Sequence, residues 1–125
     1  MAVTHPTLVR TGIADFVVDQ IDEGVPPGLL VMQTSGDVEV ATLTFANPAF
    51  GAAASGTATA GAIVSDTNAT GGTIAKARFK NAASTDKVIC SVTGTGGGGD
   101  IELSSVVVSA GQTVSLSSLT YSAPA

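Results

Sequence analysis

Few residues of this 125-residue chain have the types and spacing that catalysis or metal binding requires. His5 is its only histidine, and it stands beside Pro6 with no acid or nucleophile next to it, whereas a Ser-His-Asp triad would need it inside a site. Cys90 is the only cysteine, so an internal disulfide is impossible, and the apolar run around it indicates a small, buried side chain. We therefore predict a protein without enzymatic activity.

Two pairs of carboxylates have a spacing that could serve a cation. Asp37 and Glu39, and likewise Asp100 and Glu102, stand two residues apart, so on a strand the members of each pair share a face. Calcium takes six to eight oxygen ligands, and each pair alone supplies too few of them. We therefore predict no metal site and no cofactor.

The glycine-rich segment 94–99 could cradle a phosphate with its backbone N–H groups. It lacks the Lys-Ser/Thr that completes a phosphate-binding loop, and it leads into a predicted strand instead of a helix. We interpret it as a flexible strand connection and as one of the candidate contact elements, with Gly97 in it.

A basic strand face is the sharpest feature of the chain. Strict alternation in 73–80 puts Lys76, Arg78 and Lys80 on one face and Ala77 and Phe79 on the other. Like charges on one face repel one another unless acidic groups or solvent compensate them. Three sources of compensation stay open: the acidic stretch 15–23 of the same chain, an acidic surface on a partner, or solvent. The candidate partner-binding residues are Lys76, Arg78, Lys80, Val3, Thr4, His5 and Gly97.

Composition argues against two kinds of partner. Ten acidic residues against five basic ones give a net charge of −5, which disfavours binding to nucleic acid. No run of about 18 apolar residues suggests a membrane-spanning helix, and no secretory signal pattern is visible at the start. We expect neither nucleic acid nor membrane as a partner.

One helix is predicted near the start, over residues 11–24. Thr11 is the expected N-cap and Gly24 the expected C-cap. The apolar residues that recur at helical spacing, and so define the expected buried face, are Ile13, Phe16, Val17 and Ile21. Residues 1–10, which contain Pro6, read as an N-terminal arm.

The rest of the chain reads as β-structure. Alternation and turn residues predict two hairpins, over 28–45 and 73–93, and a single strand over 56–65. Residues 99–125 read as a terminal hairpin around a turn at 109–112. The predicted fold is mainly β: an antiparallel β-sandwich or jelly-roll-like domain of about seven strands over 11–125, with one short N-terminal helix.

Three stretches of the chain are recognisable: ANPAFGAA at 46–53, the following GTATAGAI, and the ending DIELSSVVVSAGQTVSLSSLTYSAPA. Together they resemble a family of small virion proteins of tailed phages and prophages. The resemblance covers most of residues 11–124. The chain departs from the family in a shorter connection in the hairpin 29–45 and in AKARFK, where the family often has an aromatic pair.

The resemblance implies a structural protein of the virion, made in the cytoplasm of a host bacterium. Its most specific implication is a capsid decoration or cement protein that binds the major capsid protein and copies of itself, as a dimer or trimer. Two other roles stay open. One is a receptor- or glycan-binding module of a tail or head fibre, and the other is a subunit of the tail tube or of the head–tail connector.

Overall fold

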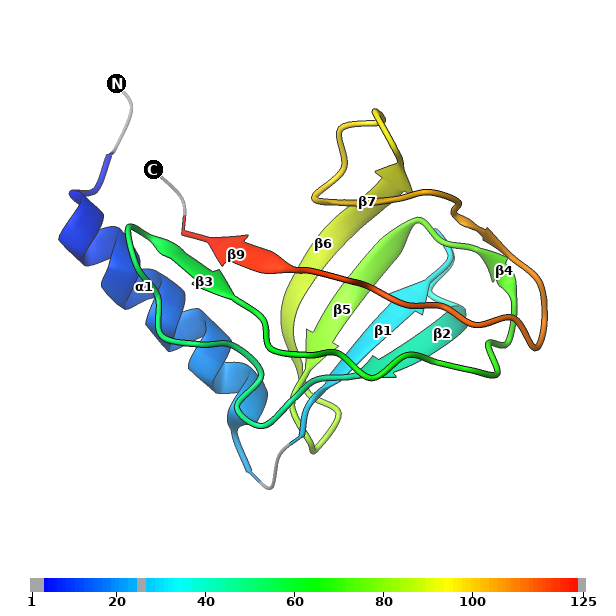
Figure 1. Ribbon diagram of the computed structural model, residues 1–125, viewed down its shortest axis with the longest axis horizontal. Helices are drawn as coiled ribbons and strands as arrows, with labels where there is room; N and C mark the ends of the chain where they lie inside the picture. Colours follow the sequence, from blue (N-terminus) through cyan, green and yellow to red (C-terminus); the bar gives the residue numbers. More distant parts are fainter. Residues whose placement is uncertain (1–3, 25–26, 124–125) are drawn as a thin grey trace.

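The computed structural model describes residues 4–24 and 27–123, and it is mainly β with one short helix (Figure 1). The predicted fold class is confirmed at this level. The described part of the chain contains nine strands instead of about seven. The additional strands are short pieces of two or three residues, which form where irregular segments run beside one another.

A curled five-stranded sheet forms the body of the molecule, in the order β2-β1-β5-β6-β7. Its strands are β1 (Leu29–Gln33), β2 (Glu39–Thr44), β5 (Lys76–Lys80), β6 (Asp86–Gly94) and β7 (Ile101–Leu103). The antiparallel pairs β1–β2 and β5–β6 confirm both predicted hairpins. The prediction of a wholly antiparallel domain is wrong at one edge, because β7 runs parallel to β6 after the glycine-rich segment has carried the chain back.

The helix begins earlier than the sequence predicted. α1 (Thr7–Asp19) starts directly after Pro6 and continues into the 3-10 turn η1 (Gln20–Asp22), so residues 7–10 are helical and not part of an arm. Proline is tolerated at a helix start because the first N–H groups have no partner within the helix. Thr11 is therefore not the N-cap. Its hydroxyl donates to the Thr7 carbonyl oxygen (2.9 Å) and accepts from the Gly56 N–H (2.9 Å).

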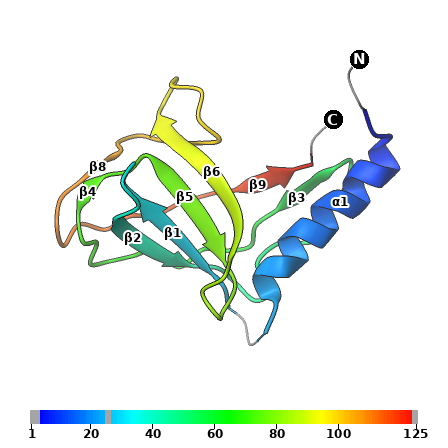
Figure 2. The same ribbon diagram turned by 180° about the vertical axis from the view of Figure 1, so that it is seen from behind.

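The helix also buries a different face from the expected one. Ala14, Val18 and Ile21 are buried, whereas Phe16 is 67% exposed. Of the expected face only Ile21 is fully buried. Ala14 faces inward because its small side chain lets α1 lie close to the strands beneath it, β3 (Thr57–Thr59) and β9 (Thr120–Ser122) (Figure 2).

The predicted terminal hairpin is wrong, although its turn forms. The Gln112 N–H donates to the Ser109 carbonyl oxygen (3.0 Å) across the turn. The strands on either side pair elsewhere: β8 (Val107–Val108) with β4 (Gly72–Thr73), and β9 (Thr120–Ser122) with β3 (Thr57–Thr59). The strand predicted over 56–65 is thus reduced to β3. The C-terminal segment closes the fold by long-range pairing, as the red strand β9 lying beside the green strand β3 shows in Figure 1.

The core lies on the inner face of the curled sheet. Its three phenylalanines, Phe45, Phe50 and Phe79, contact one another with ring centroids 5.5 to 6.4 Å apart. The largest side chains that are fully buried are Phe45, Ile21, Leu30, Met32, Leu43, Ile74 and Val40. One face of β5 joins this core through Ala77 and Phe79, which fixes the basic residues on the outer face.

Candidate functional site

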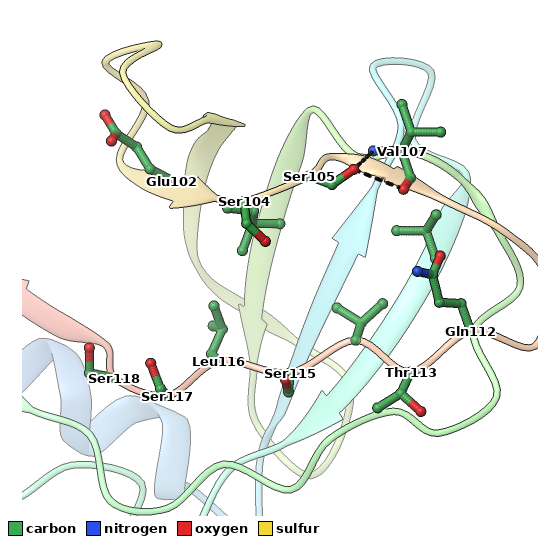
Figure 3. Close-up of a pocket in the computed structure, with 13 residues that line it drawn as sticks. Glu102, Ser104, Ser105, Val107, Gln112, Thr113, Ser115, Leu116, Ser117 and Ser118 are labelled. Atoms are coloured by element: carbon green, nitrogen blue, oxygen red, sulfur yellow. Dashed lines mark hydrogen bonds between the residues drawn. The ribbon is translucent and has the colours of Figure 1, made fainter.

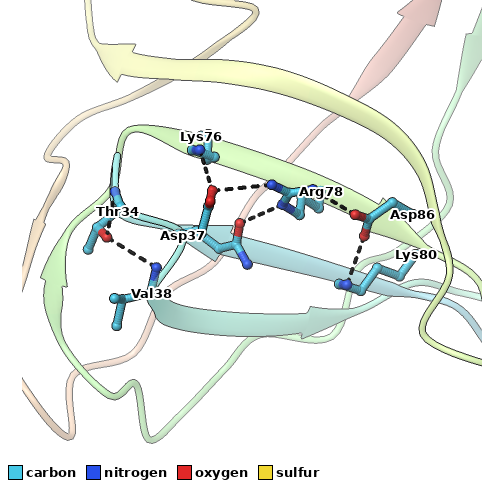
Figure 4. Close-up of polar contacts among 9 residues, drawn as sticks. Thr34, Asp37, Val38, Lys76, Arg78, Lys80 and Asp86 are labelled. Atoms are coloured by element: carbon cyan, nitrogen blue, oxygen red, sulfur yellow. Dashed lines mark hydrogen bonds and ion pairs between the residues drawn. The ribbon is translucent and has the colours of Figure 1, made fainter.

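The outer face of β5 carries the basic residues, and acidic residues of the same chain neutralise most of their charge (Figure 4). Arg78 lies between two carboxylates: its Nη2 is 3.2 Å from Asp37 Oδ1 and its Nη1 is 2.6 Å from Asp86 Oδ2. Lys76 Nζ also pairs with Asp37, and Lys80 Nζ lies 2.7 Å from Asp86 Oδ1. Three cations thus share two anions on one surface.

The hairpin turns hold these carboxylates in place. Asp37 lies in the β1–β2 turn with a φ of 68°, and this turn is closed by the Thr34 N–H donating to the Val38 carbonyl oxygen (2.8 Å). Asp86 begins β6, directly opposite Lys80 in the antiparallel register. Gln33 Oε1 on β1 accepts from Arg78 Nε (2.7 Å). The network is therefore built across neighbouring strands.

The network changes the titration of its members. Hydrogen bonds from Lys76 and then Arg78 lower the pKa of Asp37 below its ordinary value. The hydrogen bond from Lys80 lowers the pKa of Asp86, with Arg78 adding to it. The carboxylates in turn raise the pKa of Arg78, Asp86 more than Asp37. With three basic and two acidic side chains, the surface has a formal net charge of +1.

The acidic residues of 15–23 form other contacts and do not neutralise the basic face of β5. Asp15 and Asp22 accept from the backbone N–H groups of Ala53 (2.7 Å) and Ala49 (2.9 Å), and so tie the segment after β2 to the helix. Glu23 pairs with Lys87 (3.2 Å), outside the basic face. The basic face is therefore neutralised within the chain, but by Asp37 and Asp86 and not by the acidic stretch 15–23.

The glycine-rich segment is held by a carboxylate of its own chain. Glu102 accepts from the N–H groups of Gly96 and Gly98 through its two oxygens (3.1 Å each). Gly99 N–H donates to Thr93 Oγ1 (3.0 Å), and Gly97 is exposed. The donors that a phosphate would need therefore already have a partner.

The other carboxylates that could have bound a cation are likewise engaged. Asp100 Oδ2 accepts from the backbone N–H (2.9 Å) and the hydroxyl (3.1 Å) of Ser91. Glu39 accepts from the hydroxyls of Thr42 and Thr70, at 2.7 Å each. Within residues 4–24 and 27–123, no group of three or more His, Cys, Asp or Glu is arranged to hold a metal ion.

The candidate residues of the N-terminal arm lie away from the basic face. Thr4 and His5 are exposed and precede α1, which packs on β3 and β9, while Lys76, Arg78 and Lys80 lie on the outer face of the main sheet. Val3 lies outside the described residues. The fold therefore does not gather the sequence-predicted contact residues into one site.

Cys90 is half-buried, not fully buried as expected. It lines a groove of about 550 Å³ between β6 and β9, together with Val88, Ile101 and Tyr121. Burial, and secondarily the negative charge of Asp100, raises the pKa of the thiol to about 11. The thiol is therefore protonated at neutral pH and is a poor nucleophile.

A second cavity, of about 380 Å³, was not predicted from the sequence. Figure 3 shows it between β7, β8 and the segment leading to β9. Hydroxyl groups dominate its lining, with one amide and one carboxylate; its polar residues are Glu102, Ser104, Ser105, Gln112, Thr113, Ser115, Ser117 and Ser118. The density of serine in 104–118 was a weak signal for it, because serine is also common in ordinary strands and loops.

No helix among the described residues is long and apolar enough to cross a membrane. Comparisons with protein-family models, with curated proteins and with solved structures found no match.

Proposed function

We propose that this chain is a non-enzymatic structural protein of a phage virion, and specifically a capsid decoration or cement protein. It would bind the major capsid protein and copies of itself, as dimers or trimers, on the outside of the shell, after synthesis in the host cytoplasm. In this proposal the curled sheet and the two small sheets together act as a sandwich-like domain of the jelly-roll type.

One observation carries the proposal: large apolar side chains are exposed on the surface of this domain. Its carboxylates, by contrast, mostly bind backbone groups and basic side chains of the same chain. The exposed apolar side chains among the described residues are Leu8, Val9, Phe16, Val38, Val64, Ile89 and Val107, each at least 46% exposed. Contiguous exposed apolar surface suits contact with proteins, and three of these residues, Leu8, Val9 and Phe16, gather on α1. The sequence resemblance to phage virion proteins supports the same reading.

A cement protein stabilises the shell by mass action, because it binds assembled subunits and not free ones. Particles assembled without the chain should therefore lose resistance to heat and to low salt, and adding the purified chain back should restore it. Unchanged particle stability would contradict the role. The copy number gives an independent check, since a cement protein should be present in a fixed, high ratio to the major capsid protein.

The cavity of about 380 Å³ favours a second candidate, a glycan- or receptor-binding module of a fibre. Hydroxyl, amide and carboxylate groups can exchange hydrogen bonds with a sugar. A few copies per particle, located at the tail, would select this role over the first. A tube or connector subunit would instead form rings when purified.

A further inference from the structure

The outward face of α1 is apolar, which is unusual for a helix lying on a small β domain. This face lies opposite the buried Ala14 and Val18, and it carries Leu8 (84% exposed), Phe16 (67%) and Val9 (46%). A surface helix normally puts charged and polar residues there. Both ribbon views show α1 at one end of the molecule with its outer side uncovered (Figures 1 and 2).

The face has a notch at its centre. Leu8, Gly12 and Phe16 are four residues apart and form one row along the helix. A Cβ atom added at Gly12 would meet nothing within 4 Å, so the space in front of the backbone is open. Such a row, with large side chains on either side of a glycine, allows another helix to approach closely at the glycine.

We propose that this face binds a second copy of the chain, with the two α1 helices antiparallel and crossing at Gly12. A two-fold axis at that point relates each residue to the one equally far on the other side of Gly12. Leu8 of each copy then lies level with Phe16 of the other, and both notches meet at the centre. The face is thus complementary to itself, which an isologous dimer requires.

Charge favours the antiparallel arrangement over the parallel one. In an antiparallel pair, Asp19, which is exposed, lies level with His5 of the other copy, so no two carboxylates meet. A parallel pair would set Asp19 against Asp19. Like charges at contact disfavour an interface.

The area involved suits a dimer of moderate affinity. Leu8, Val9 and Phe16 together expose on the order of 400 Å² of apolar surface per copy. A standard interface buries about 800 Å² per partner, a little over half of it apolar. The dimer specifies the contact between copies in the proposed function and rests on that part of it; it is tested on the isolated chain, whereas the capsid role is tested on particles.

Sedimentation velocity of the purified chain over a range of concentrations tests the proposal. We expect a reversible dimer that Gly12→Leu weakens at least tenfold, because the new side chain fills the notch. The monomer should tolerate this change, with an unchanged circular dichroism spectrum and a thermal midpoint no lower than before, since Leu is the better helix former. The matched control is Val107→Glu, an exposed apolar site away from α1, which should leave the dimer unchanged.

Disulfide trapping tests the direction of the helices, in a Cys90→Ala background. Gly12→Cys should form a cross-linked dimer on oxidation, because the two positions meet at the axis. Leu8→Cys alone should not, since the two copies of residue 8 lie about 12 Å apart in the antiparallel pair. A mixture of Leu8→Cys and Phe16→Cys chains should cross-link.

Three results would overturn the proposal. One is a chain that stays monomeric at high micromolar concentration. If Leu8→Glu then abolished binding to particles, the apolar face would bind the capsid and not a second copy. Another is a dimer that Gly12→Leu leaves intact. The third is equally efficient trapping through Leu8→Cys alone, which would indicate a parallel pair.

Discussion

At the scale of single residues, the acidic side chains mostly bind groups of their own chain. Glu102 holds the glycine-rich segment, Asp22 holds the backbone at Ala49, and Asp37 and Asp86 hold the basic residues of β5. The bonds from basic side chains favour the charged forms of Asp37 and Asp86 and so lower the pKa of both. The acidic excess of this protein thus serves its own fold, and the basic face keeps little charge with which to attract an acidic partner.

The lowered pKa values of Asp37 and Asp86 predict a pH-dependent contribution to stability. Below their ordinary pKa of 3.8, both groups bind protons more readily in the unfolded chain than in the folded one. The contribution is therefore fully present above about pH 5 and is lost as the pH falls through the lower folded values.

The double variant Asp37→Asn with Asp86→Asn tests this contribution. It should have a lower urea midpoint than the parent protein at pH 7, and the gap should close near pH 2. Asp19→Asn, at an exposed acid of α1 outside this network, is the matched control. A gap of the same size at both pH values would refute the contribution.

At the scale of elements, small residues decide which face of α1 is buried. Ala14 is fully buried and Phe16 is largely exposed, although Phe has far more apolar surface to remove from water. The helix can lie close to β3 and β9 only through a small side chain. The close contact also lets Thr11 and Asp15 accept hydrogen bonds from the backbone N–H groups of Gly56 and Ala53, so these partly buried donors have partners.

A pair of substitutions on α1 tests this assignment. Ala14→Leu should overpack the contact and lower the free energy of unfolding by about 1–3 kcal/mol. Phe16→Ser, measured at a concentration where the chain is monomeric, should change it by less than about 0.5 kcal/mol. Urea unfolding followed by circular dichroism gives both values. A larger loss of stability for Phe16→Ser than for Ala14→Leu would mean that the helix buries the face containing Phe16, as the sequence predicted.

At the scale of the whole molecule, three phenylalanines join parts of the chain that are distant in sequence. Phe45 follows β2, Phe50 lies near the loop tied to the helix, and Phe79 belongs to β5. Their mutual contact ties the main sheet to the segment that packs beneath α1. A domain of this size has a total stability of about 5–15 kcal/mol, so the loss of one ring matters to the whole fold.

Phe45→Ala should therefore destabilise the domain by about 3–5 kcal/mol, because it removes a ring that is 1% exposed and leaves a cavity. Phe45→Leu, which refills most of the space, should cost clearly less. Val107→Ala, at an exposed position, should cost less than about 0.5 kcal/mol. Equilibrium unfolding measures all three, and a mild effect of Phe45→Ala would mean that the cluster does not hold the fold together.

The amino-acid sequence by itself determined the local β-structure. The hairpins β1–β2 and β5–β6 were predictable because each pairs strands that are neighbours along the chain, joined by short turns. The division of β5 into a buried face and a basic face followed from side-chain alternation alone. The turn at 109–112 was also predictable, since a turn depends on a few adjacent residues.

Only the tertiary structure decided the long-range features. β8 pairs with β4 and β9 with β3, and nothing in these sequences of two or three residues specifies a partner so far along the chain. The buried face of α1 depends on how closely β3 and β9 approach it, and the neutralising partners of Lys76, Arg78 and Lys80 depend on which turns lie over β5. The hydroxyl-lined cavity exists only because β7, β8 and the chain before β9 meet in space. Local propensities act over a few residues, whereas these contacts are selected by the packing of the whole chain.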